Sequence, residues 1–514
     1  MKATINAVLL ITLSAAASAA NAAPNLVLIV TDDLGYGDVG CYGGKAIPTP
    51  RIDRMAAEGI RMNRCYAPAS TCTPTRFAIM TGQYAWRPTK RKTTVLDGDA
   101  PLAIAPGRPT LPAILAEAGY DTALVGKWHL GIGDGDTPID FNGHVGPGPI
   151  EVGFREAFYI PATVDRVPCV FVDNHAVANL DPNDPIRISY REKVGDEPTG
   201  IERPDLLKYG ADDQHAGTII NGISRIGFMA GGASARWIDQ DITDVLAKRA
   251  SDYIRRQRDK PFFLMLGTHD PHVPHDPHPR FIGASDAGIR GDAIVQADWL
   301  VGTVLDALAA AGIEDQTLVI VTSDNGPTIF DGYFDGSVAA SRDHAAAGRL
   351  RGGKYLVYEG GCRVPCIVRW PGTIPAGVSE ARFSLIDLLP SLASIAEIDE
   401  LPLGIGRDGV DRSAMLLDPN AESDDEPLIL QGVRNARALI AGDWKFIPSN
   451  AGSSPSGLGR GADPRDTRFA EATVHEDTLL DLSADPSETT NVIAQHLEKA
   501  EALRALLATI AEND

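Results

Sequence analysis

The stretch NLVLIVTDD, residues 25–33, is an apolar and β-branched run that ends in two adjacent aspartates. A proline precedes the run and glycines follow it. A short apolar run between turn formers is typical of a strand that is buried on both faces of a parallel sheet. The stretch TLVIVTSDNG, residues 317–326, repeats this design and ends in Asp324 and Asn325. Each stretch therefore predicts a buried strand that presents oxygen-bearing side chains at its end.

Two further apolar runs also end in titratable side chains. They are DTALVGKWHLG at 121–131, with Lys127 and His129, and PFFLMLGTHDPHVP at 261–274, with His269 and His272. Helical patterns lie between the runs, for example at 51–59 and 293–312. This alternation predicts an α/β fold with a large central, mostly parallel sheet sandwiched by helices. In such sheets a functional site forms beyond the carboxyl ends of the strands, where all four runs place polar residues.

The rest of the chain follows other patterns. The segment 134–240 is rich in Gly, Pro and Asp and weakly periodic, and we interpret it as an insertion that shapes a substrate pocket. From residue 425 onward, short alternating runs and a final amphipathic pattern predict a smaller C-terminal α+β subdomain on a short antiparallel sheet. The predicted units are a leader at 1–22, a main α/β domain at 23–424 and this subdomain at 425–514.

The leader reads MKATINAVLLITLSAAASAANA, with one lysine, an apolar stretch and small residues up to Ala22. This pattern predicts a cleavable secretory signal peptide, because its apolar core is shorter than the ~20 residues of a membrane anchor. No later segment is expected to span a bilayer. The sequence therefore predicts a periplasmic or secreted protein without a membrane partner.

The whole chain is acidic, with a formal net charge of −21 over 514 residues. Such a chain repels DNA, RNA and anionic lipid, so nucleic acid is not an expected partner. An anionic substrate would need a local basic pocket that works against this field. Six cysteines are present. Export permits disulfides, but if one cysteine serves chemistry the others cannot all pair, so disulfides are not expected to be the main support.

Four side chains at the ends of two predicted strands offer only oxygen ligands: Asp32, Asp33, Asp324 and Asn325. An all-oxygen set suits a hard cation, and it favours calcium over magnesium because no polyphosphate is needed to complete the shell. The alternative interpretation is that these residues form turns and cap helices. Two matching pairs on separate apolar runs favour the metal.

The segment HDPHVPHDPH, residues 269–278, carries a histidine at every third position. Its prolines exclude a helix and favour polyproline II, which would place successive imidazoles roughly 9 Å apart. Zinc ligands lie about 2 Å from one ion, so this spacing argues against a zinc site. We expect one histidine to reach the functional site, and His269 and His278 to make structural or substrate contacts.

The pentapeptide CTPTR at 72–76, followed by TG at 81–82, resembles the Cys-x-Pro-x-Arg signature of formylglycine-dependent sulfatases in the alkaline phosphatase-like superfamily. Other family segments follow in the same order: TDD, GKWHLG, PHVP, SDNG and LRGGKYLVYEGGCRVP. The resemblance covers residues 24–375, and LLDLSADPSETTNV near the C-terminus resembles the family more loosely.

This resemblance implies that a maturation enzyme oxidises Cys72 to formylglycine, whose hydrated form attacks sulfur. Calcium would be held by the four oxygen-bearing residues together with modified residue 72. Three side chains would supply positive charge: Arg76, Lys127 and Lys354. The family pattern makes His129 the base that restores the aldehyde, and makes His272, chosen over His275, or Lys354 the acid for the leaving alcohol.

Local signals around Cys72 also predict its setting. Thr73 can cap a helix and Pro74 can take its first position, so Cys72 is expected just outside the helix start, in an exposed turn that the maturation enzyme can reach. A helix start favours negative charge, whether on an alkoxide or on sulfate. The alternative is an unmodified cysteine, either buried or reactive.

The predicted substrate is a sulfated carbohydrate with a galactose- or N-acetylgalactosamine-type sugar, attacked at chain ends. TVDRVPCVFVDNH (163–175) and DDQH (212–215) hold the candidate sugar contacts Arg166, His175 and His215, which could equally be ordinary loop residues. The alternatives are an arylsulfatase, a phosphonate or phosphate monoester hydrolase of the same superfamily, and a non-catalytic protein that binds sulfated glycans.

Overall fold

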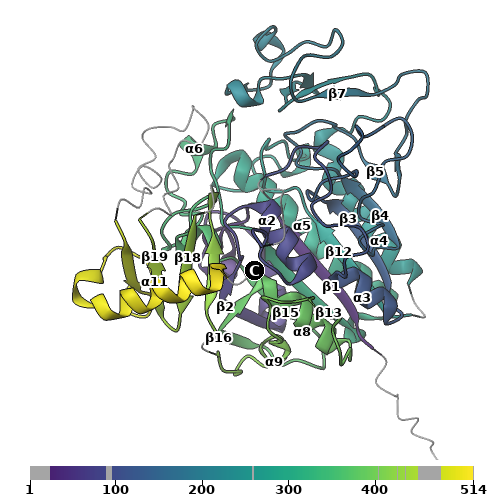
Figure 1. Ribbon diagram of the computed structural model, residues 1–514. Helices are drawn as coiled ribbons and strands as arrows, with labels where there is room; N and C mark the ends of the chain where they lie inside the picture. Colours follow the sequence, from purple (N-terminus) through teal and green to yellow (C-terminus); the bar gives the residue numbers. More distant parts are fainter. Residues whose placement is uncertain are drawn as a thin grey trace, which may run out of the picture.

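The four apolar runs form adjacent parallel strands at the centre of one sheet (Figure 1). In spatial order they are β13 (Thr317–Ser323), β1 (Asn25–Thr31), β12 (Phe262–Gly267) and β3 (Asp121–Lys127). Nearly every residue of these strands is buried, as the apolar runs predicted. Because the strands are parallel, their carboxyl ends meet at one edge of the sheet. The computed structural model describes residues 23–87, 95–257, 260–402, 404–424, 426–433, 436–449 and 476–512.

The sheet has 10 strands and is mixed at its flanks. The remaining strands are β2 (Ile60–Tyr66), β4 (Glu156–Ile160), β5 (Val172–Asp173), β6 (Ala176–Val177), β15 (Cys366–Arg369) and β16 (Gly377–Ser384). Strand β15 runs antiparallel between β13 and β2, and β4, β5 and β6 form antiparallel pairs at the other edge. The predicted large sheet with a parallel centre is confirmed.

Helices cover both faces of this sheet (Figure 1). They are α1 (Pro50–Glu58), α2 (Cys72–Thr81), α3 (Leu111–Glu117), α4 (Ile242–Arg256), α5 (Gly288–Ala311), α6 (Ser337–Ala340), α7 (Glu359–Cys362), α8 (Leu388–Ile395) and α9 (Ser413–Leu417). Helices α1 and α4 pack against α5, whereas α2, α3 and α8 pack against one another. All ten residues of α2 are buried, so the helix that begins at Cys72 lies inside the protein.

Helix α5 corrects the expectation that no segment after the leader could span a bilayer. By length and composition alone, α5 is long and apolar enough to cross a membrane, and it is the one such helix among the described residues. Its most apolar 18 residues have a mean hydropathy of 1.4. In the fold, 61% of that window is buried against other parts of the protein. The apolar composition is that of a core helix packed between α1 and α4.

Segment 134–240 does more than form loops. Its strands β4, β5 and β6 extend the large sheet, and the remainder forms short antiparallel pairs at the top of Figure 1. Those pairs involve β7 (Arg187–Ser189), β8 (Gly210–Ala211), β9 (Ile219–Ile220), β10 (Ile223–Ser224), β11 (Phe228–Ala230) and, from outside the segment, β14 (Tyr333–Phe334).

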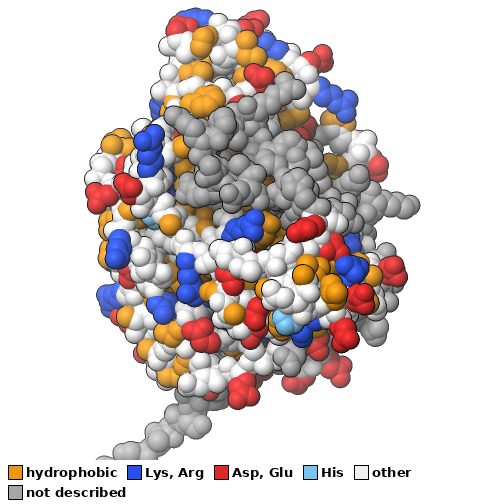
Figure 2. All heavy atoms as spheres, turned by 90° about the vertical axis from the view of Figure 1, so that its left-hand side faces the viewer, with side chains coloured by type: hydrophobic (Ala, Val, Ile, Leu, Met, Phe, Trp, Pro, Cys, Tyr) orange, Lys and Arg blue, Asp and Glu red, His pale blue; other side chains and the backbone are white. Residues whose placement is uncertain are grey.

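The C-terminal region forms a separate antiparallel sheet of four strands, as predicted. The strands are β17 (Leu428–Gln431), β18 (Arg437–Ala441), β19 (Trp444–Ile447) and β20 (Thr478–Asp481), and helix α11 (Leu497–Glu512) packs on β18 and β19. Figure 2 shows this side of the molecule, where acidic and basic side chains are interspersed over the coloured part of the surface. The predicted leader at 1–22 lies outside the described residues.

A fully buried group of charged side chains joins this sheet to the main domain. Lys445 on β19 places its Nζ 3.1 Å from Glu359 Oε1 and 2.8 Å from Glu488 Oε1. The hydroxyl of Tyr66 donates to the other oxygen of Glu359 at 2.8 Å, and the backbone N–H of Glu359 donates to Glu488 Oε2 at 2.6 Å. We call these four residues the Lys445 cluster.

Candidate active site

Cys72 is the first residue of α2, whereas the sequence predicted a helix that begins at Pro74 with Thr73 as its cap. Thr71 occupies the cap position with no side-chain cap bond, and Pro74 is the third helical residue. Thr73 does not cap the helix because its hydroxyl donates instead to the backbone carbonyl of His129 at 3.0 Å. The predicted cap was therefore wrong, although the helix start and its free N–H groups do lie at residue 72.

The turn before Cys72 is held by the C-terminal sheet. The N–H of Ser70 donates to the carbonyl of Gln431 at 2.8 Å, and the N–H of Gln431 donates to the carbonyl of Pro68 at 2.9 Å. The hydroxyl of Thr75 donates back to the carbonyl of Ala69 at 2.9 Å. The position of residue 72 thus depends on strand β17, far along the chain.

The side chain of Cys72 is buried, with 1% of its surface exposed, so the expectation of an exposed turn was wrong. Burial raises the pKa of its thiol above the ordinary value, and the nearby positive charge of Lys127 offsets this only in part. A neutral thiol is a poor nucleophile, because the thiolate is the reactive form. Burial therefore disfavours the reactive thiolate form of the unmodified cysteine.

The imidazole of His129 directs its Nδ1 atom toward Cys72. Its Nδ1 lies 3.3 Å from the sulfur, and its Nε2 lies 2.9 Å from the carbonyl oxygen of Leu96. A carbonyl only accepts hydrogen bonds, so Nε2 carries the proton and Nδ1 presents a lone pair to residue 72. Burial, with the charges of Lys127 and Arg166, holds the pKa of His129 well below its usual range. This imidazole is neutral and can accept a proton from a group at position 72.

The predicted metal ligands converge at the ends of β1 and β13, which pair in register from Asn25 to Thr31. Lys127 Nζ lies 2.7 Å from Asp32 Oδ2, and Arg76 Nε lies 2.8 Å from Asp324 Oδ2. Asn325 Nδ2 donates to Asp33 Oδ1 at 2.7 Å. Arg76 also donates from Nη1 to the carbonyl of Lys127 at 3.0 Å. All six side chains are buried, so their charges interact with little screening by solvent.

Three buried polar atoms of this group have no hydrogen-bond partner among the described residues: Asp32 Oδ1, Asn325 Oδ1 and Arg76 Nη2. Buried polar atoms are normally satisfied, so unpaired oxygens on two ligand candidates fit a cation that they would bind. Asp32, Asp33 and His272 also bring potential ligand atoms within 4.8 Å of one another. Burial raises the pKa of Asp32 to about 8 in spite of Lys127, so keeping this carboxylate ionised calls for additional positive charge. The residues fit a hard divalent cation such as calcium.

Lys354 and His272 both lie beside Asp33, one of the predicted metal ligands. Lys354 Nζ is 2.8 Å from Asp33 Oδ2 and 2.9 Å from Asp331 Oδ2, and His272 Nε2 is 3.9 Å from Asp33 Oδ2. The two carboxylates outweigh burial and hold the pKa of Lys354 well above its usual range, so it stays an ammonium. His272 donates from Nδ1 to the carbonyl of Val273 at 2.6 Å, and burial with Lys354 holds its pKa well below the usual range.

The other histidines of the 269–278 segment point elsewhere. His269 Nε2 lies 3.0 Å from the Thr243 hydroxyl, and His275 Nδ1 lies 2.5 Å from Asp335 Oδ2. His278 accepts a bond from the backbone N–H of Arg280 at 3.3 Å. Only His272 among these four contacts a metal-ligand candidate in the described structure, as expected of one histidine. The reason differs from the prediction, because residues 270–274 form a turn and bends and not an extended polyproline II segment.

Two of the three candidate sugar contacts meet at Asp165. Arg166 Nη1 lies 2.9 Å from Asp165 Oδ2, and His215 Nε2 lies 3.5 Å from the same oxygen while its Nδ1 lies 2.7 Å from Asp212 Oδ1. Bonds to the two carboxylates outweigh burial and raise the pKa of His215 to about 9. Gly332 closes over this ring with a φ of 95°, and a Cβ there would come within 2.0 Å of His215 Nδ1.

Sequence reasoning missed Asp165 and Asp331. Asp165 links Arg166 to His215, and its charge also acts on His272. Its only signal in the sequence was its place next to Arg166. Asp331 holds Lys354 and accepts a hydrogen bond from Tyr355 at 2.8 Å, but no motif marks it.

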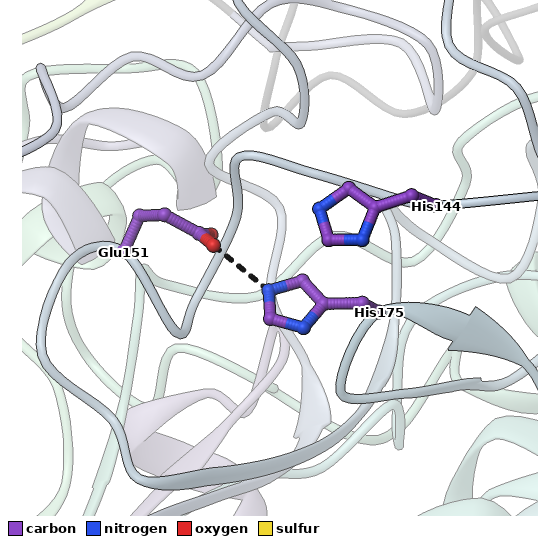
Figure 3. Close-up of side chains that lie close together, drawn as sticks. All are labelled: His144, Glu151 and His175. Carbon is purple, nitrogen blue, oxygen red and sulfur yellow. Dashed lines mark hydrogen bonds and ion pairs between the residues drawn. The ribbon is translucent and has the colours of Figure 1, made fainter.

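The third candidate sugar contact, His175, lies apart from this group, in the turn between β5 and β6. Its Nε2 lies 2.8 Å from Glu151 Oε1, and its ring stacks on His144 with the centroids 4.4 Å apart (Figure 3). Neither partner belongs to the group around Cys72.

The chain is similar to known proteins over most of its length. The sulfatase family model matches residues 24–398. An N-acetylgalactosamine-6-O-sulfatase of Bacteroides thetaiotaomicron is 45% identical over 95% of this chain and 93% of its own, and human arylsulfatase A is 33% identical over 91% and 83%. A solved structure described with the metabolism of multiple glycosaminoglycans by Bacteroides thetaiotaomicron superposes with a TM-score of 0.88 at 43% identity, covering 95% of this chain and 99% of its own. The family model and these relatives span most of the chain, which therefore belongs to the sulfatase family of enzymes that hydrolyse sulfate esters.

Proposed function

We propose that the enzyme removes a 6-O-sulfate from N-acetylgalactosamine or galactose at the end of a sulfated saccharide. The relative that is 45% identical over 95% of the chain is an N-acetylgalactosamine-6-O-sulfatase, which supports desulfation of a carbohydrate. The observation that carries the proposal is the neutral His129, whose lone pair faces residue 72 among three buried cations. A negatively charged sulfate ester fits such a setting better than a neutral ester does.

The proposal includes calcium and a formylglycine at position 72. When bound, calcium would supply a Lewis acid at the sulfate, and formylglycine would supply a hydrated aldehyde as nucleophile. Asp32, Asp33, Asp324 and Asn325 would hold the metal, in line with the unpaired oxygens on two of them. A modified side chain at position 72 would meet His129, which lies 3.3 Å from the cysteine sulfur, and the N-terminus of α2.

Proton transfer in this scheme depends on three side chains. His129 holds a lone pair at Nδ1 toward position 72 and can take a proton from a hydroxyl there. Lys354 holds its protons as an ammonium between Asp33 and Asp331, so it can donate one to the leaving alcohol oxygen. His272 could donate only from Nε2 after protonation, because its Nδ1 proton is bound to the carbonyl of Val273.

Arg76 and Lys127 bind and orient the anionic group. Arg76 Nη2 is buried and unpaired among the described residues, so it can donate to a sulfate oxygen without breaking an existing bond. Burial alone would lower the pKa of Lys127, but Asp32 and Asp324 raise it, so this side chain also stays charged. These buried cations can attract an anionic sulfate in spite of the negative net charge of the chain, because charges interact strongly in a poorly screened interior.

Arg166 and His215 are the sugar contacts that this scheme favours. The charge of Arg166 acts on His129, and the Asp165 that binds both residues acts on His272, so the pair borders the site of the ester. His215 stays cationic near neutral pH, and because Asp212 and Asp165 face its two ring nitrogens, it would act on the sugar through its charge and through the position it gives Arg166. The enzyme would be exported to the periplasm or beyond, and its remaining partner would be the maturation enzyme.

Initial rates on a panel of defined sugars test the proposal. We expect turnover of the 6-sulfates of N-acetylgalactosamine and galactose, and rates at least tenfold lower on the 4-sulfates and on an aryl sulfate. A matched phosphate ester separates a phosphatase, and saccharide binding without sulfate release separates a non-catalytic protein. Turnover confined to aryl sulfates or phosphates would refute it. Mass spectrometry of the peptide around residue 72 reports the aldehyde independently of rate.

A further inference from the structure

A second group of potential metal ligands lies at the edge of the large sheet, away from Cys72. His144 and Glu151 come from the loop before β4, and His175 comes from the turn between β5 and β6. The three side chains bring ligand atoms within 4.8 Å of one another, and His175 Nε2 lies 2.8 Å from Glu151 Oε1. Figure 3 shows one nitrogen of each imidazole on the side where Glu151 lies.

The backbone already holds these side chains together. The N–H of Val145 donates to the carbonyl of His175 at 2.8 Å, which joins the two segments next to both rings. The N–H of Gly148 donates to Glu151 Oε2 at 2.5 Å and leaves Oε1 directed at His175. A Cβ on Gly146 would lie 3.0 Å from His144 Nε2 and 3.3 Å from His175 Cδ2, so the backbone of this loop passes close beneath both rings.

A buried hydroxyl beside this loop is also unpaired. Tyr159 OH has no hydrogen-bond partner within the part of the chain that the structure describes, and the tyrosine has none of its surface exposed. A Cβ on Gly148 would lie 3.4 Å from this hydroxyl, and the charge of Glu151 contributes to raising the pKa of Tyr159. Such a hydroxyl is suited to bind a metal-bound water or the ligand carboxylate, as outer partners of metal sites do.

We propose that His144, Glu151 and His175 bind a divalent transition-metal ion of the zinc type. Two imidazoles and a carboxylate are a typical zinc set, in which the ligands lie about 2.0–2.2 Å from the ion and a water takes the fourth position. The rings are now stacked, with 22° between their planes, so binding requires a rotation of His144. That side chain is exposed and can turn at little cost.

This site differs in chemistry from the one around Cys72. The Cys72 group offers mainly carboxylate and amide oxygens, which suit calcium, whereas the nitrogen ligands here suit zinc, nickel or copper. The two sites share no residue. An ion here would tie the β5–β6 turn to a loop that also meets the segment after His129, since the N–H of Gly133 donates to the carbonyl of Pro147 at 2.7 Å.

The test titrates zinc into calcium-loaded protein and measures binding by calorimetry and bound metal after gel filtration. The variants are His175→Gln and Glu151→Gln, and the control is His496→Gln, which removes an exposed histidine of the C-terminal region. Cobalt provides a second probe, because its visible absorption reports tetrahedral nitrogen and oxygen ligation. Circular dichroism shows whether each variant is folded.

We expect wild type and His496→Gln to bind one zinc ion more per chain than either site variant. The site variants should bind zinc about 100-fold more weakly or worse, because the loss of an outer partner alone costs about 10–100-fold. The cobalt absorption and the zinc-dependent rise in Tm should disappear in the same two variants. Equal zinc stoichiometry in wild type and folded His175→Gln or Glu151→Gln would overturn the proposal and leave an ordinary hydrogen bond between His175 and Glu151 with a stacked ring.

Discussion

The group around Cys72 and the Lys445 cluster are both fully buried and both rich in charge, yet they differ in how completely their atoms are paired. In the Lys445 cluster, each oxygen of Glu359 meets a partner, and Glu488 Oε1, which accepts no hydrogen bond within the described residues, still lies 2.8 Å from the Lys445 ammonium. Around Cys72, oxygens of Asp32 and Asn325 and a nitrogen of Arg76 have no partner in the described structure.

This difference separates two uses of buried charge. A paired set of charges holds two parts of the fold in one arrangement, and removing one member leaves the others uncompensated. An unpaired set costs stability, and proteins retain such a cost where a ligand will complete the set. On this physical ground the Cys72 group is expected to bind ligands and the Lys445 cluster to fix position.

The largest expected effect comes from Cys72→Ala. Removing the residue that would carry the nucleophile should lower kcat for the sugar 6-sulfate by about 10⁴-fold or more, while the fold is kept because alanine fits the space. Rates and circular dichroism measure the two outcomes. Full activity in the folded variant would contradict the whole scheme.

The next largest effect tests the Lys445 cluster. Lys445→Met leaves Glu359 and Glu488 buried without their cation and should lower the free energy of unfolding by about 3–5 kcal/mol. Urea titration measures it. A combined Lys445→Met, Glu359→Gln, Glu488→Gln variant should recover much of the loss, because no uncompensated charge remains. If the single variant were as stable as wild type, the cluster would not fix the two parts of the fold.

Asp324→Asn separates the two kinds of site by their response to calcium. We expect turnover to fall by about 10²–10³-fold, because a carboxylate beside the reacting group is lost. Calcium should raise Tm in wild type, since a ligand that binds the folded state stabilises it, and this rise should vanish in the variant. Asp387→Asn changes a buried aspartate paired with Arg412 elsewhere and should keep the rise. A calcium response retained in Asp324→Asn would place the ion somewhere else.

His215 gives a smaller, pH-dependent effect. Its pKa is raised from 6.5 to about 9 in the folded protein by Asp165 and Asp212, so its stabilisation is complete below about pH 6.5 and is lost as pH rises through about 9. The total is at most about 3 kcal/mol. Urea midpoints at pH 6, 7.5 and 9 should fall less in His215→Gln than in wild type. Parallel pH profiles would show that His215 does not carry this charge.

Much of the fold and of the Cys72 group could be predicted because the signals are local. The apolar runs that became β1, β3, β12 and β13 carry their polar residues within a few positions of each strand end. The rules for parallel sheets then bring those ends together. The proline spacing predicted that one imidazole of the 269–278 segment reaches the site, and the choice of His272 over His275 came from the family resemblance.

The rest depends on contacts between distant residues. Asp331 has no local motif, and Glu488 lies in a segment that resembles the family only loosely. Each matters only because the fold brings it to Lys354 or to Lys445. The exposed cysteine was a wrong prediction because a turn with proline usually lies at the surface, whereas here α2 is covered on all sides. The cap was wrong because Thr73 binds His129, a residue 56 positions away.

The contact between Ser70 and Gln431 affects when the turn before Cys72 can form during folding. The two residues are 361 positions apart, so the turn before Cys72 cannot take its final form until nearly the whole chain has been made. In the folded protein the side chain of Cys72 is enclosed. The maturation enzyme proposed above would therefore have to act before β17 pairs with this turn.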